Sequence, residues 1–307
     1  MSSPTTSVLY DIPGPRARRR ALIGSAIATV LLIVLLWLVI GRLADQEQFS
    51  MERWGPLIDP SNENFVQVWK LLGTGLRGTL IAATLAIILS TLIGTILGTV
   101  RMMTSGLARL PLVTLIELFR GLPVIVTIYL AYRVLPDLGV DVSPLPGPDG
   151  LWFLVIGLTA YNSVIIAEIL RAGVASLPRG QREAGLATGL TNLQTMRLIL
   201  LPQSFRIMLP ALISQLIVIL KDTSLAALIG LYAELLRSGR DIIGVLENPI
   251  QTYFVVAIMF IALNFALSRL AVYLEARLAR GRTSGTGAPA PTALESGLSQ
   301  TAMAGGA

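Results

Sequence analysis

Long apolar runs separated by short polar segments are the dominant pattern of this chain. Six runs are predicted to be transmembrane helices, at about residues 21–41, 73–100, 110–135, 151–170, 207–220 extended at both ends, and 253–274. Each approaches the roughly 20 residues that a helix needs to cross a bilayer. Pro210, near the start of the fifth run, is tolerated where neighbouring helices satisfy the freed carbonyl. The run 225–231 is too short to cross alone, so residues 223–239 are predicted to be partly re-entrant or external.

The basic residues are distributed unequally between the two sides of the membrane that these runs define. Most lie on one side, namely Arg16, Arg18, Arg19, Arg20, Arg101, Arg109, Arg171, Arg179, Arg182, Arg197, Arg206, Arg277, Arg280 and Arg282. The opposite side carries only Arg42, Arg53, Lys70, Arg237 and Arg240. Cytoplasmic loops are enriched in Lys and Arg, so both termini are predicted to be cytoplasmic and residues 42–72 external.

Composition supports an all-α integral membrane protein and narrows its chemistry. Of the 307 residues 53% are hydrophobic and 14% charged, and the mean hydropathy is +0.71. A soluble domain of this length needs more charged surface. The sequence has no cysteine or histidine, which removes disulfides, thiol chemistry and the commonest general base and metal ligand. We therefore expect no metal and no cofactor, and the formal charge of +6 is explained by the loops rather than by nucleic acid.

The two ends of the chain are predicted to lie outside the transmembrane core. Residues 21–41 have the basic flank of a signal peptide, but the apolar run is too long and lacks a close A-x-A-like site, which favours an uncleaved anchor. Residues 1–20 and 281–307 are predicted to be cytoplasmic disordered tails because of their polar, Gly-, Ala- and Ser-containing composition. The core is expected over residues 73–280.

The cytoplasmic segment 176–203, SLPRGQREAGLATGLTNLQTMRLILLPQ, is the most informative part of the sequence. Helix-forming residues flank a break at residues 189–192, which predicts two short helices joined by a turn. Such an element at the membrane surface, with the Glu183 carboxylate and several arginines exposed, is suited to docking another protein. The alternative is an amphipathic interfacial loop without a partner.

The spacing in this segment resembles the cytoplasmic signature of binding-protein-dependent ABC importer permeases. The matching residues are Glu183, Ala184, Gly185, Gly189, Ile199, Leu201 and Pro202. Gly185 departs from the family's alanine, which we interpret as mild because both residues are small. The resemblance implies that residues 176–203 are a coupling loop. Glu183, Ala184, Gly185 and Gly189 would then contact an ATPase subunit, while Leu201 and Pro202 would hold the loop against the next span.

Three other stretches are similar to polar amino-acid permeases of this family. They are Glu117–x–x–Arg120–Gly121–x–Pro123, the run from Ala167 to Gln181 containing Glu168 and Arg171, and the segment LKDTSL at residues 220–225. The resemblance spans about residues 73–274. It implies a type I importer permease fold with a five-helix core, to which residues 21–41 add one N-terminal helix. Residues 10–15 also look like glutamate permeases of high-GC Gram-positive bacteria.

Ionisable groups inside spans are costly and therefore suggest function. Glu117 and Arg120 are three residues apart on one helix face, as are Glu168 and Arg171. These pairs could line a translocation path, or they could be structural ion pairs or side chains that snorkel to the interface.

Two further polar groups within or near the spans leave a similar choice open. Lys221, Asp222, Thr223 and Ser224 could contact an amino-acid zwitterion, or they could cap a helix end. Asn162 could line the path or bond a neighbouring helix. The Gly94–x–x–x–Gly98 pair is predicted to pack closely against another helix.

The sequence thus predicts a bacterial plasma-membrane permease subunit that is not itself an enzyme. It has no G-x-x-x-x-G-K phosphate loop, so a partner ATPase must supply the energy. The resemblance further implies an extracellular substrate-binding protein, a second identical or related permease, and glutamate as the substrate. The main alternative is an ion- or proton-coupled secondary transporter, which needs free intramembrane carboxylates. A membrane enzyme is not supported, because the sequence offers no nucleophile–base pair and no set of metal ligands. A membrane anchor or assembly factor would not need the docking loop.

Overall fold

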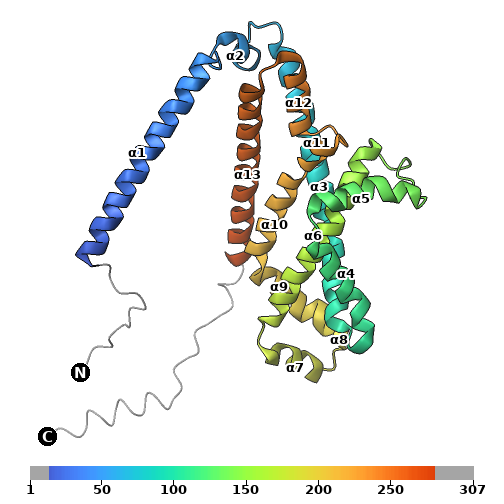
Figure 1. Cartoon of the computed structure of the whole chain (residues 1–307). Helices are drawn as coiled ribbons and strands as arrows, with labels where there is room; N and C mark the ends of the chain where they lie inside the picture. Colours follow the sequence, from blue (N-terminus) through green and yellow to red (C-terminus); the bar gives the residue numbers. More distant parts are fainter. Residues whose placement is uncertain (1–13, 281–307) are drawn as a thin grey trace, which may run out of the picture.

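The computed structural model describes residues 14–280, and helices account for most of them (Figure 1). In chain order these are α1 (Pro15–Asp45), α2 (Met51–Ile58), α3 (Phe65–Met103), the 3-10 turn η1 (Gly106–Arg109), α4 (Leu110–Gly121), α5 (Val124–Asp137), α6 (Asp149–Ala175), α7 (Arg179–Ala187), α8 (Asn192–Thr195), the π-helical segment η2 (Met196–Leu200), α9 (Leu201–Ile207), α10 (Leu209–Asp222), α11 (Leu225–Ile229), α12 (Leu235–Leu246) and α13 (Pro249–Arg280).

The helices that are long and apolar enough to cross a membrane match the predicted runs. Five such stretches occur in the described residues, and their bounds are Pro15–Asp45, Phe65–Met103, Asp149–Ala175, Leu209–Ile229 and Pro249–Tyr273. The bent pair α4–α5 makes a sixth if its two halves count as one span. The prediction of an all-α membrane protein is confirmed.

The shape of the third predicted span, residues 110–135, is wrong. It is not one helix, because α4 and α5 meet at an angle of 109°. The break falls at Leu122 and Pro123, which both have extended backbone conformations. Proline removes a helical hydrogen-bond donor and disfavours the α conformation of the residue before it, so Pro123 ends α4 and starts α5 in a new direction.

Other predicted bounds change by several residues. The first helix begins at Pro15 rather than residue 21, with proline in the first turn, where its missing N–H costs nothing. The predicted tail 1–20 is therefore helical from residue 15. The rest of that tail and the whole tail 281–307 lie outside the described residues. The fifth span is preceded by α9 and a break at Met208, and the segment 223–239 forms α11 and the start of α12.

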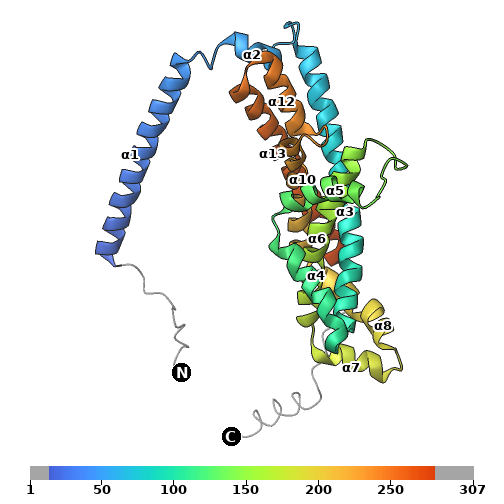
Figure 2. The same cartoon turned by 45° about the vertical axis from the view of Figure 1, so that its right-hand side comes forward.

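Helix α1 stands apart from the rest of the molecule in two views (Figures 1 and 2). None of its residues is buried. The chain that follows α1 is attached to the core by both apolar and polar contacts. Leu57 of α2 is buried in a core cluster, and Trp54 packs edge-on against Phe254 of α13. The Gln251 side chain, at the start of α13, donates to the Gln48 carbonyl, and Trp54 donates to the same carbonyl. Asn248 donates to the Arg53 carbonyl nearby. The structure thus fixes the C-terminal end of α1 and leaves its apolar surface open to lipid.

The centre of the core is a close contact between α3 and α6. A methyl group at Gly94 would lie 2.6 Å from the Ser163 carbonyl oxygen and 2.8 Å from Ile166 Cβ. One at Gly98 would lie 3.0 Å from the Ala167 carbonyl oxygen. Small residues allow helix backbones to approach in this way in membranes. The predicted packing role of Gly94 and Gly98 is confirmed.

A second close contact joins α12 to the outer part of α3. The Thr79 hydroxyl accepts a hydrogen bond from the Leu235 N–H. The fully buried Glu234 carboxylate caps α12 by accepting from the backbone N–H groups of Leu236 and Arg237. Burial raises the pKa of Glu234 to about 7. The two backbone N–H bonds favour the charged form and act in the opposite direction, but burial has the larger effect. The Thr79–Leu235 bond attaches the segment between α10 and α13 to the core, and the Glu234 cap holds the start of α12.

We expect Gly94→Ala to destabilise the protein by about 1–3 kcal/mol, because the new methyl group overpacks the α3–α6 contact. The matched control is Gly73→Ala in the same helix, where a methyl group meets nothing within 4 Å. Thermal unfolding of the purified protein in detergent measures both. An equal effect of the two substitutions would contradict the close contact.

Candidate functional site

The predicted docking segment forms two short helices joined by a turn, as expected. Helix α7 ends before Gly189, whose φ of +85° is the left-handed conformation that favours glycine. The Thr191 hydroxyl accepts from the Gln194 N–H, and the Gln194 side chain accepts from the Thr191 N–H, a capping box that starts α8. Arg182 donates to Asn192 at 3.1 Å and so ties α7 to α8.

Gly185 lies inside this element rather than on its surface, and its departure from alanine has a packing reason. It is buried, whereas Glu183, Ala184 and Gly189 are exposed. A methyl group at position 185 would lie 2.7 Å from Thr195 Cγ2. Glycine therefore allows α7 to rest closely on the end of α8 and on η2, and the interpretation of the substitution as mild is incomplete.

The far end of the segment is attached to the core by apolar contacts. Leu201, only 8% exposed, clusters with Met196 and Leu200, and this cluster packs against Met102 of α3 and Val174 of α6. Pro202, in the first turn of α9, is exposed.

A cavity of about 520 Å³ opens beside α7. Its polar lining comes from Arg179, Arg182 and Glu183, and its apolar lining includes Leu177 and Leu186. The segment therefore presents a carboxylate, two arginines and an indentation on one surface, which a partner protein could fill.

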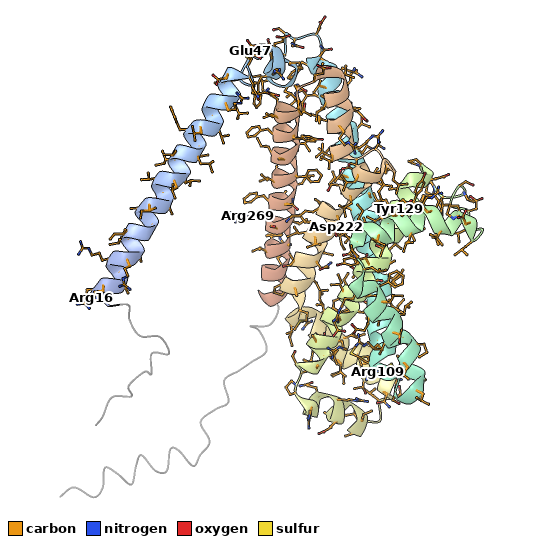
Figure 3. All side chains as sticks on the ribbon, in the orientation of Figure 1. Arg16, Glu47, Arg109, Tyr129, Asp222 and Arg269 are labelled. Carbon is orange, nitrogen blue, oxygen red and sulfur yellow. The ribbon has the colours of Figure 1, made fainter. Side chains whose placement is uncertain are left out.

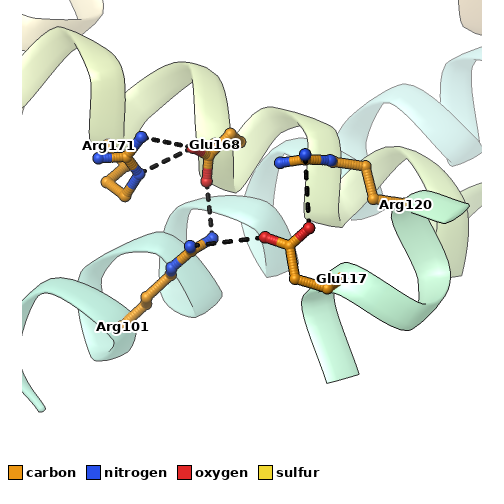
Figure 4. Close-up of polar contacts among 5 residues, drawn as sticks. All are labelled: Arg101, Glu117, Arg120, Glu168 and Arg171. Atoms are coloured by element: carbon orange, nitrogen blue, oxygen red, sulfur yellow. Dashed lines mark hydrogen bonds and ion pairs between the residues drawn. The ribbon is translucent and has the colours of Figure 1, made fainter. Parts of the chain in front are cut away.

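Five charged side chains from α3, α4 and α6 meet in one cluster (Figure 4). Both predicted pairs form: Glu117 lies 3.4 Å from Arg120, and Glu168 lies 2.5 Å from Arg171. Arg101 joins them, since its Nη1 donates to Glu168 at 2.6 Å and its Nη2 lies 3.7 Å from Glu117. Each carboxylate therefore faces two guanidinium groups, which compensates its removal from water.

In the sequence Arg101 counts only as a loop charge, and its contacts with Glu117 and Glu168 are not predicted. A signal was available, because Gly94, Gly98 and Arg101 follow the i, i+4, i+7 spacing of one helix face. The two glycines meet α6, so the arginine one turn further along must also face α6. The helix spacing does not predict which acidic residues contact Arg101.

The Lys221–Ser224 group does not converge on one point. The Thr223 hydroxyl donates to the Leu220 carbonyl and the Ser224 hydroxyl to the Lys221 carbonyl, so both bond their own helix end. Among the described residues, Lys221 and Asp222 form no ion pair with each other. Lys221 instead lines a cavity of about 400 Å³ between α10 and α13, together with Ser224 and Asn264.

Asn162 is fully buried and connects two helices. Its amide donates to the Leu158 carbonyl at 2.8 Å, and its oxygen accepts from the Gln215 side chain of α10 at 2.6 Å. This geometry favours helix–helix bonding over a pore-lining position. Among the described residues, no group of three His, Cys, Asp or Glu side chains could hold a metal ion.

We expect Asn162→Ala and Gln215→Ala each to lower thermal stability, and the double variant to lose less than the sum. Intramembrane hydrogen bonds contribute about 0.6 kcal/mol on average and up to ~1.7 kcal/mol. A double-mutant cycle by unfolding in detergent measures this coupling. Strictly additive losses would show that the two amides do not act together.

Residues 90–280 match the family described as binding-protein-dependent transport system inner membrane component. This match covers more than half of the chain, which therefore belongs to that family of membrane permease subunits. Subunits of this class carry no catalytic activity, and the ATPase is a separate subunit.

Curated relatives cover most of the chain. A glutamate transport system permease protein of Corynebacterium glutamicum is 39% identical over 243 residues, which are 78% of this chain and 85% of that protein. A probable glutamine ABC transporter permease of Bacillus subtilis is 34% identical over 71% of this chain and 96% of its own length.

A solved structure supports the fold. The chain matches a crystal structure of an amino acid ABC transporter with histidines at a TM-score of 0.60 and 29% identity, covering 69% of this chain and 96% of that one. The predicted importer permease fold is thereby confirmed.

Proposed function

We propose that this chain is the permease subunit of an ATP-driven importer of polar amino acids, with glutamate as its substrate. The observation that carries the proposal is the docking segment 176–203, whose exposed Glu183 and Ala184 lie on a capped helix pair attached to the core. Glutamate is supported by the 39% identity with the Corynebacterium permease. Glutamine is the alternative that the Bacillus relative supports.

The partners in this proposal are an ATP-binding subunit, an extracellular substrate-binding protein and a second permease, identical or homologous. The ATPase docks on Glu183, Ala184 and the surroundings of Gly189. Both termini are cytoplasmic, in keeping with the charge distribution. Arg16 and Arg109 lie toward the same end of the molecule and Glu47 toward the other (Figure 3).

The proposed mechanism is alternating access driven through the coupling loop. ATP closes two ATPase subunits, and their movement displaces the loops of two permeases, so that the path between them opens toward the loaded binding protein. Glu117, Arg120, Glu168 and the Lys221–Ser224 group are candidates for contact with the passing amino acid. Asn162 supports the helices around that path.

A secondary transporter is less well supported. Such a protein needs a carboxylate that is free to bind the coupling ion. Glu117 and Glu168 each face two arginines, so neither is available without breaking ion pairs. The docking segment would also have no use in a transporter without an ATPase.

Uptake in proteoliposomes tests the proposal directly. The chain is reconstituted with its ATPase, its binding protein and, where needed, a second permease, and labelled amino acids are compared. We expect ATP-dependent glutamate uptake that requires the binding protein. ATP-dependent uptake of glutamine instead would correct the substrate only, whereas uptake driven by an ion gradient without ATPase would overturn the importer.

We expect Glu183→Lys to abolish co-purification of the ATPase subunit, because reversing an interface charge places like charges together and costs several kcal/mol. Glu63→Lys makes the same change at an exposed position on the opposite side and should leave co-purification intact. Normal association and uptake in the Glu183 variant would show that the docking surface lies elsewhere.

A further inference from the structure

We infer that Arg101 is a positioning residue that transmits movement of the coupling loop to the bent helix pair α4–α5. The inference rests on the proposed function, because it gives Arg101 a part in coupling ATP hydrolysis to transport. It adds a residue that neither the docking signature nor the predicted substrate path contains.

The first observation is how the five charged residues are distributed over three helices. Glu117 and Arg120 belong to α4, and Glu168 and Arg171 belong to α6, so each of these pairs lies within one helix. Arg101, from α3, is the residue that contacts both carboxylates. Removing its charge would leave each carboxylate with an arginine on its own helix. The connection between helices would be lost while no carboxylate is left without a partner.

The second observation is burial. Arg101 is 8% exposed, and its Nε has no hydrogen-bond partner within the described residues. Arg120 and Arg171, in contrast, have side chains that are 48% and 37% exposed. Arg101 is therefore held between helices, where its guanidinium group loses contact with water. This is expected of a residue that joins helices, whereas a snorkelling arginine would extend its charged end to water.

The third observation links Arg101 to the coupling loop. The next residue, Met102, packs against Met196, Leu200 and Leu201 of the loop. Val174 of α6 packs against the same three residues. Just beyond the loop, the Ser204 hydroxyl of α9 also donates to the Leu170 carbonyl of α6 at 3.0 Å. The ends of α3 and α6 therefore both rest on the element that would dock the ATPase.

The fourth observation concerns what Arg101 can move. Glu117 lies one to two turns before the break at Leu122 and Pro123, where the chain turns by 109°. A helix interrupted in this way can change its angle at a few residues, whereas a continuous helix moves as one body. A displacement of the loop would shift α3 and α6 together, and the Arg101–Glu117 contact would pass that shift to α4.

The test compares Arg101→Gln with Arg109→Gln in the complete transporter in proteoliposomes. Arg109 is exposed near the same end of the molecule and forms no ion pair among the described residues, which makes it a matched control (Figure 3). The readouts are amino acid imported per ATP hydrolysed, stimulation of ATP hydrolysis by loaded binding protein, ATPase co-purification and thermal stability.

For Arg101→Gln we expect import per ATP to fall by roughly 2- to 30-fold, the range of coupling effects that single residues exert. Co-purification of the ATPase should remain, because the Glu183 surface is unchanged, and stimulation by the binding protein should be weakened. Arg101→Lys should be intermediate, since one ammonium cannot reproduce the guanidinium fork between two carboxylates. Arg109→Gln should match the native transporter.

Glu117→Gln provides the second arm. If Glu117 acts through Arg101, its loss should lower import per ATP, and the double variant should be no worse than either single one. Unchanged import per ATP in Arg101→Gln would overturn the inference, as would losses of transport that only follow losses of stability or assembly. A native transporter without ATP-driven uptake would contradict the proposed function itself.

Discussion

The close approach of α3 and α6 is the contact on which the arrangement of the charged residues depends. Gly94 and Gly98 let the two backbones meet, and this fixes both the rotation and the depth of one helix against the other. With that rotation set, Arg101 faces Glu168. A side chain larger than hydrogen at either glycine would separate the helices and lengthen the ion pair as well.

Inside a membrane, charges must find partners, and the molecule meets this requirement in a way that connects its elements. Two carboxylates and three guanidinium groups form one cluster across three helices instead of separate pairs. Met102, the residue after Arg101 in α3, packs against the apolar cluster of Met196, Leu200 and Leu201. The same ion pairs therefore do two things. They compensate the desolvation of the charged groups, and through Arg101 they join α4 to α6.

The segment 176–203 combines an exposed surface with a firmly packed base. Its turn, capping box and buried Gly185 give it a defined shape before any partner binds. A pre-shaped element loses little conformational entropy on docking and transmits displacement to the helices beneath it. In contrast, within residues 14–280, α1 is attached only through the chain at its C-terminal end and has no buried residue. It can therefore contribute to membrane anchoring without constraining the core.

The sequence alone determined the membrane spans, the helix–turn–helix form of residues 176–203 and the packing role of Gly94 and Gly98. Each is a local property, because a transmembrane helix satisfies its own backbone and reveals itself by its run of apolar residues. Only the tertiary structure decided that residues 110–135 bend at Pro123, that Arg101 bridges Glu117 and Glu168, and that Asn162 bonds Gln215. These contacts join residues distant in the chain. They depend on how each helix is rotated against its neighbours, which hydropathy does not specify.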